Sequence, residues 1–136
     1  MSARENPEQF ARGTRGEWSP GEAHERAMSM PIEAVVKELT GLLGSKSVAM
    51  IGGVAETRAV AQWTEGRAPQ RPNVLRFTLQ VASMILSARD PDIVRAWFHG
   101  SNPHLGDRVP AVLLRDEPLV EIQGDIMAAA RIFAAR

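Results

Sequence analysis

"GGVAETRAVAQWTEGRAPQRP", residues 52–72, joins a glycine pair, a short amphipathic segment and a basic, proline-containing exit. Adjacent glycines interrupt a helix because glycine has no Cβ and adopts a left-handed turn without strain. Val60 and Trp63 follow at a spacing of three, which places two apolar side chains on one helical face. The stretch therefore predicts a helix over residues 56–65 that packs inward after a tight turn.

The residues around this turn match the offsets of a helix-turn-helix motif. Such a motif has a small residue in its first helix, a glycine in the turn and an apolar residue directly after it. Ala49, Gly53 and Val54 occupy these positions. With the apolar face of the second helix inward, Arg58 and Gln62 share its outer face, where arginine pairs with guanine and glutamine with adenine in the major groove.

Charge along the chain is uneven, although the net charge is zero. Residues 45–89 hold six Lys/Arg side chains against two Glu, whereas residues 1–44 and 90–136 each hold five against seven acidic ones. A local basic excess suits a polyanionic partner. The residues expected to contact double-stranded DNA are Thr57, Arg58 and Gln62 on the helix and, at the phosphates, Arg67 and Arg71.

Two features leave another interpretation of this helix open. Glu65 shares part of its outer face and would repel phosphate. A helical hairpin whose charged face is only solvated explains the same pattern without DNA.

Beyond this stretch, apolar residues recur at helical spacing and no segment alternates as a strand does. Prolines open several of the segments and glycines close them. The prediction is an all-α protein, a helix-turn-helix core followed by a small α-helical C-terminal domain. The expected helices cover residues 31–43, 46–51 with Ser45 as the cap, 56–65, 73–87, 91–99, 110–114 and about 118–136.

The chain divides into three parts by composition. Residues 1–30 are rich in polar residues and glycine, so we expect a flexible arm in which Phe10 and Trp18 could dock. Residues 31–88 hold the expected DNA-binding domain, and residues 89–136 hold the expected helical domain for a toxin or other partner.

Several classes of protein are not supported by the 136-residue sequence. It has no cysteine, which excludes disulfides and thiolate zinc sites, and no apolar run long enough to cross a membrane. His99, His104 and Asp107 lie in a loop at spacings that match no strong metal site, and no catalytic constellation is present. We therefore expect a cytoplasmic protein that is not an enzyme and has no cofactor or metal.

Two stretches together resemble the antitoxins of the Xre/MbcA/ParS-like group. They are "LTGLLGSKSVAMIGGVAETRAVAQWTEGR", residues 39–67, and "WFHGSNPHLGDRVPAVLL", residues 97–114. The likeness covers about residues 32–136. Its more distinctive part is carried by Trp97, Asn102, Pro103, Leu105, Pro110, Leu113 and Leu114.

This resemblance implies a homodimer that represses its own operon through an inverted repeat. It also implies that the C-terminal domain covers a RES-type toxin that consumes NAD. The surface facing that toxin would then include Asn102, Pro103, His104, Arg108, Arg131 and Arg136. Two alternatives remain: an orphan helix-turn-helix regulator whose C-terminal domain serves dimerisation or another partner, and a protein-binding module that does not touch DNA.

Overall fold

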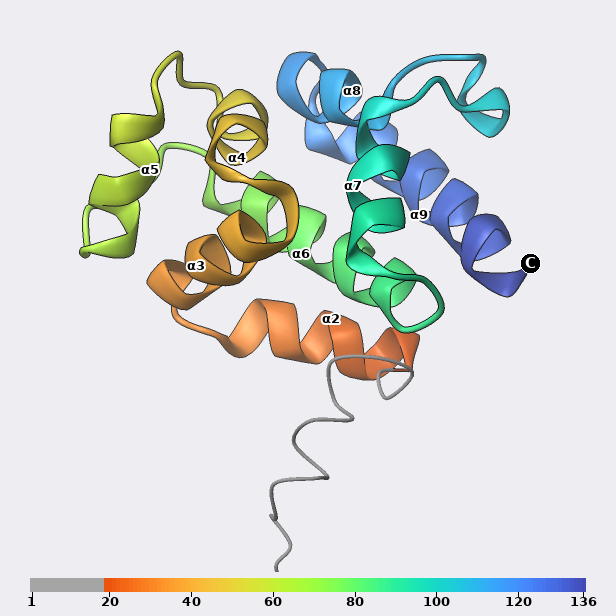
Figure 1. Ribbon diagram of the computed structural model, residues 1–136, viewed down its shortest axis with the longest axis horizontal. Helices are drawn as coiled ribbons and strands as arrows, with labels where there is room; N and C mark the ends of the chain where they lie inside the picture. The colour runs from red at the N-terminus through yellow and green to blue at the C-terminus, as the bar shows by residue number, and fades with distance from the viewer. Residues whose placement is uncertain (1–18) are drawn as a thin grey trace, which may run out of the picture.

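The computed structural model describes residues 19–136, and these residues confirm the all-α prediction. They form eight α-helices and one 3-10 turn, with no β-strand among them (Figure 1). In chain order the elements are α2 (Pro20–Ser29), α3 (Ile32–Leu43), α4 (Ser45–Gly52), α5 (Thr57–Thr64), α6 (Pro72–Leu86), α7 (Pro91–His99), η1 (Pro103–Leu105), α8 (Pro110–Asp116) and α9 (Leu119–Ala135).

Helix α6 runs through the middle of the molecule and organises the other helices (Figure 1). Ten of its 15 residues are buried, so it must be surrounded by other helices on nearly all sides. It packs against α2 and α3 on one side and against α9 on another. Its buried Thr78 hydroxyl donates to the Val74 carbonyl at 2.7 Å, so this polar atom is hydrogen-bonded inside the core.

Local signals in the sequence place most of the helix ends. Pro72, Pro91 and Pro110 lie in the first turn of α6, α7 and α8, where a missing N–H costs no hydrogen bond. Gly44 ends α3 with φ 90° and also precedes α4. Ser45, expected as the cap of the second helix, is therefore its first residue instead.

One hydrophobic core joins the parts of the chain on either side of residue 88. Its members run from Ala27 in α2 to Ala130 in α9. It contains fully buried side chains from three different helices, among them Leu39 of α3, Leu75 of α6 and Phe98 of α7. The two halves that the sequence distinguishes, residues 31–88 and 89–136, thus share one core.

The flexible arm predicted for residues 1–30 is wrong from Pro20 onward, because residues 20–29 form helix α2 against α6. Ser19 and Glu22 form a capping box, in which each side chain accepts from the other's backbone N–H. Only two alanines of α2 are buried, Ala23 and Ala27, so the helix shows little apolar periodicity. Residues 1–18, including Phe10 and Trp18, lie outside the described residues.

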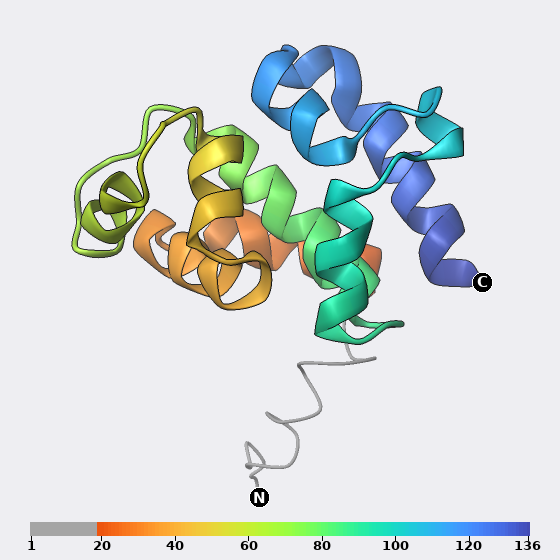
Figure 2. The same ribbon diagram turned by 45° about the horizontal axis from the view of Figure 1, so that its top comes forward.

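Helix α5 and the end of α9 lie at opposite ends of the molecule in both ribbon views (Figure 2). Helices α6 and α7 lie between α5 and the end of α9 and keep these two parts of the molecule apart. Within residues 19–136, no helix has the length and apolar character needed to cross a membrane.

Candidate nucleic-acid and partner interfaces

The turn between α4 and α5 needs both of its glycines. Gly53 has φ 84°, a left-handed conformation that a side chain disfavours. Gly52 is needed for space, because a Cβ there would lie 2.7 Å from Cη2 of Trp63. The Val54 N–H donates to the Ala49 carbonyl at 2.9 Å and closes the turn. The indole of Trp63 can therefore pack directly on the end of α4.

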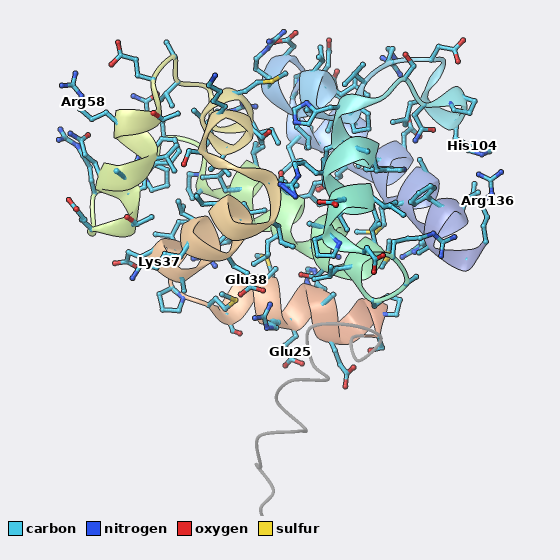
Figure 3. All side chains as sticks on the ribbon, viewed as in Figure 1. Glu25, Lys37, Glu38, Arg58, His104 and Arg136 are labelled. Carbon is cyan, nitrogen blue, oxygen red and sulfur yellow. The ribbon has the colours of Figure 1, made fainter. Side chains whose placement is uncertain are left out.

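Helix α5 has a buried face and an exposed face, as its sequence predicts. Val60 and Trp63 are buried in the core. Thr57 and Arg58 are exposed at the first turn, and Arg58 points outward at the edge of the molecule (Figure 3). Gln62 is half-buried, so it is less accessible than Thr57 and Arg58.

A concave surface of about 720 Å³ lies between α4 and the start of α5. Its polar lining comes from Lys46, Glu56, Thr57 and Arg58. Arg58 lies 3.6 Å from the carboxylate of Glu56, and both side chains are more than 70% exposed. This exposed pair is weak, so Arg58 can exchange Glu56 for another anion at little cost.

Arg67 and Arg71, both expected at phosphates, differ in the structure. Arg67 is exposed in the loop after α5. Arg71 is half-buried and donates to the carbonyls of Ile51 at 2.9 Å, Leu114 at 2.8 Å and Arg115 at 3.1 Å. The guanidinium thus joins the C-terminal ends of α4 and α8, a structural role that leaves fewer of its N–H groups for the expected phosphate contact.

Two further arginines of the basic segment bind helix ends in the same way. Arg76 donates to the carbonyls of Ala27 at 2.9 Å and Met30 at 2.6 Å, at the end of α2. Arg89 donates to the carbonyls of Phe133 and Arg136, at the end of α9. Unpaired carbonyls and the helix dipole make helix C-termini good sites for cations. Half of the six basic side chains between residues 45 and 89 therefore support the fold.

Helix α4 is also joined to the C-terminal half at its first turn. The Ser47 hydroxyl and Nε2 of His99 are hydrogen-bonded, 2.7 Å apart. Together with Arg71, this contact connects α4 to α7 and α8 at its two ends. Among the residues described, no group of three or more potential metal ligands occurs.

A groove of about 300 Å³ lies between α7, the loop before η1 and the last turns of α9. Asn102, Pro103, His104 and Arg136 line it, so the structure brings together four of the six residues expected to face a partner. His104 and Arg136 lie at the same outer edge, at the right of Figure 3.

Arg108 and Arg131, the other two expected partner residues, lie elsewhere. The Arg108 side chain donates to the carbonyl of Leu105 at 2.9 Å and lines a different depression, beside α8. Arg131 is exposed but does not line the groove. It is five residues before Arg136, a spacing that places the two on different faces of α9.

Asn102 is buried and holds the loop in shape. Its side-chain oxygen accepts from the His104 N–H at 2.9 Å. Its backbone N–H donates to the Arg108 carbonyl at 3.0 Å, and together these bonds close the segment from residue 102 to 108. A partner would therefore meet Pro103 and His104, while Asn102 positions them.

Trp97 is a groove residue that the expected site omitted. Its side chain is buried and contacts the rings of Phe98 and Phe133, at centroid distances of 5.1 and 6.4 Å. Its Nε1 is the one buried side-chain polar atom of the described residues without a hydrogen-bond partner. Such an unsatisfied donor costs about 1–3 kcal/mol. The sequence did offer a signal for Trp97, because this residue belongs to the same distinctive pattern as Asn102 and Pro103.

Only one described pair of side chains has clearly shifted pKa values. The hydrogen bond from Arg115 lowers the pKa of the Asp116 carboxyl, and the charges of Arg115 and Arg71 lower it further. The same bond raises the pKa of Arg115. The side chains of Arg115 and Asp116 are 44% and 46% exposed, so this surface ion pair contributes little to stability.

Comparison with known proteins identified no matching family model, no similar curated protein and no similar solved structure.

Proposed function

We propose that this protein is a DNA-binding transcriptional regulator whose C-terminal half binds a protein partner. The observation that carries the DNA-binding part is the arrangement of α4 and α5. A left-handed glycine joins two short helices, the second packs through Val60 and Trp63, and its first turn is exposed. This is how a helix-turn-helix protein presents a recognition helix to the major groove.

In this proposal the start of α5 enters the major groove. Arg58 has the length and exposure to reach a guanine edge, and Gln62 can contact an adjacent base. Lys46 and Arg67 flank α5 and are exposed, so they suit phosphate contacts that fix the position of the helix. Arg71 acts indirectly, because it holds the end of α4.

For the partner we propose a RES-type toxin that consumes NAD, which would make this protein a cytoplasmic antitoxin. The support is the resemblance of residues 39–67 and 97–114 to the Xre/MbcA/ParS-like group, together with the groove that the second stretch helps to line. A homodimer reading an inverted repeat in its own operon belongs to the same proposal. The C-terminal half would block the toxin by covering it.

The first test is a salt titration of binding to the protein's own upstream DNA and to an unrelated duplex. A specific reader binds its own site far more tightly and loses affinity steeply with salt. Arg58→Ala combined with Gln62→Ala should abolish the preference between the duplexes. Arg131→Ala removes a charge from an exposed position on α9 and should leave the preference intact. Equal, weak binding to both duplexes would reject the DNA-binding part.

A second candidate function is a protein-binding module that does not touch DNA. It is favoured by Glu56 and Glu65, exposed at the two ends of α5, and by the use of three arginines at helix ends. An orphan regulator without a toxin is separated from the antitoxin by the neighbouring gene. A neighbour that encodes no RES-type protein favours the orphan.

A further inference from the structure

The groove beside α9 combines features that a merely structural surface does not need. Its walls are mainly apolar, from Ala96 and Trp97 of α7, Pro103 of the loop and Phe133 of α9. Ile93 lines the same groove and is 40% exposed. An apolar recess with an exposed isoleucine at its edge favours the side chain of a protein over a nucleotide phosphate.

The apolar surface continues past the groove along α9. Ile132 is 42% exposed and lies three positions after Ala129 and four before Arg136, so it shares their helical face. Of the exposed large hydrophobic side chains among the described residues, Ile93 lines the recess, and Ile132 directly precedes the lining residue Phe133 in α9. This arrangement suits an extended segment that presents a large apolar side chain.

The polar groups of the groove select the charge of that segment. His104 and Arg136 line its outer edge, and neither side chain forms an ion pair with a described residue. None of the described residues that line the groove is Asp or Glu. An acidic side chain on the partner would therefore meet the His104 imidazole and the Arg136 guanidinium with no side-chain carboxylate of the groove to repel it.

Trp97 supplies an independent indication of a ligand. It is more than nine-tenths buried, it lines the groove, and its Nε1–H has no partner among the described residues. This nitrogen is itself buried, so a peptide carbonyl or carboxylate satisfies the donor only when the groove opens beside the indole.

We propose that this groove binds an extended segment of a partner protein in which a large apolar side chain is followed by an acidic residue. The apolar side chain enters beside Trp97 and Phe133, and the carboxylate lies against His104 and Arg136. The inference rests on the part of the proposed function that gives the C-terminal half a protein partner, and it does not depend on DNA binding.

The test uses the full chain and two matched mixtures of capped hexapeptides. In one mixture Phe or Leu is followed by Asp or Glu, and in the other by Asn or Gln. Binding is followed by NMR at the assigned Trp97 Nε1–H and at the backbone amides of Ala96 and Ala129. We expect the acidic mixture to shift these three signals and to bind about fivefold more tightly than the amide mixture.

Variants then assign the difference to the proposed residues. Arg136→Gln combined with His104→Gln should remove the preference for the acidic mixture, whereas Arg131→Gln should keep it. Absence of shifts with the acidic mixture, or an unchanged preference in the double variant, would overturn the proposal. So would equal shifts produced by a short single-stranded oligonucleotide, because the site would then select anionic charge without the apolar side chain.

The same samples distinguish this inference from the function on which it rests. DNA binding is measured on each variant, and the groove variants should leave it unchanged because α5 lies at the other end of the molecule. Specific DNA binding without peptide binding would reject the groove proposal alone. Peptide binding without DNA binding would reject the regulator and leave the groove proposal standing.

Discussion

Gly52 and Gly53 are adjacent and chemically identical, yet they meet different requirements. Gly53 needs backbone freedom, because its φ is 84°. Gly52 needs empty space, because Trp63 lies where its Cβ would be. The indole of Trp63 can therefore pack on the end of α4 only because residue 52 has no Cβ atom.

Gly52→Ala should destabilise the protein by about 1–3 kcal/mol, because the new Cβ overlaps the Trp63 ring and forces a shift in the core. Urea denaturation followed by far-UV circular dichroism measures the change. Gly41→Ala is the matched control. Gly41 lies in α3 with no atom within 4 Å of a Cβ, so alanine should stabilise it by about 0.5–1 kcal/mol. Equal effects at both positions would contradict the packing explanation.

Asn102→Ala should cost about 1–2 kcal/mol, because the His104 N–H loses the side-chain acceptor that caps the turn. Ser101→Ala, at an exposed neighbouring position, should be close to neutral. Thermal unfolding of the three proteins checks both values. An unchanged midpoint for Asn102→Ala would show that the loop does not depend on this bond, and would return Asn102 to the set of partner contacts.

At the scale of elements, arginine side chains attach helix ends to one another. Arg71 joins α4 to α8, Arg76 attaches the end of α2 to α6, and Arg89 attaches the end of α9 to the turn after α6. Arg89 also lies over the Phe133 ring, 5.3 Å from its centroid. Guanidinium suits this task because its planar set of donors serves several carbonyls at once.

Arg71→Ala should lower the free energy of unfolding by about 1.5–3 kcal/mol, since three carbonyls lose a charged donor. Arg71→Lys should recover only part of this loss, because one ammonium cannot reproduce the fork. Arg67→Ala is the control, with an expected change within about 0.5 kcal/mol. Denaturant titration compares the three variants.

Under the proposed function, substitutions of Arg67 and Arg71 should also differ in their effect on DNA binding. Arg67→Ala should weaken binding to all DNA sequences. It should also reduce the slope of log affinity against log salt concentration by about one, the amount expected for one lost phosphate contact. Arg71→Ala should leave the salt slope unchanged, because its guanidinium faces helix carbonyls. A smaller salt slope for a folded Arg71→Ala protein would restore Arg71 to the phosphate contacts.

At the scale of the whole molecule, one core should produce one unfolding transition. Because α6 packs against both α3 and α9, removal of the C-terminal helices exposes its buried surface. We expect tryptophan fluorescence and circular dichroism to give coincident urea transitions for the full chain. A fragment of residues 1–88 should lose cooperative unfolding. Two separate transitions in the full chain would show that the halves fold as independent domains.

Much of the fold could be predicted from local patterns in the sequence. The inward face of α5, the left-handed turn at Gly53 and the proline starts of α6, α7 and α8 all follow from rules that act within a few residues. Helix α2 was missed for a physical reason. It buries only two alanines, and it is held by contacts such as the Arg26–Glu38 pair and Arg76, which no local pattern contains.

The features of the candidate sites also fall into two groups: those set by contacts within a few residues and those set by contacts between distant segments. The sequence by itself determined that α5 exposes Arg58 in its first turn and that Pro103 and His104 lie in an ordered loop, because helical period and turn chemistry are local. Only the tertiary structure decided which arginines are available to a ligand. Arg71 takes acceptors 20 and 43 positions away, and Arg136 reaches the groove of Trp97 only because α9 packs back across α6. Packing between distant segments, which no single stretch records, sets those contacts.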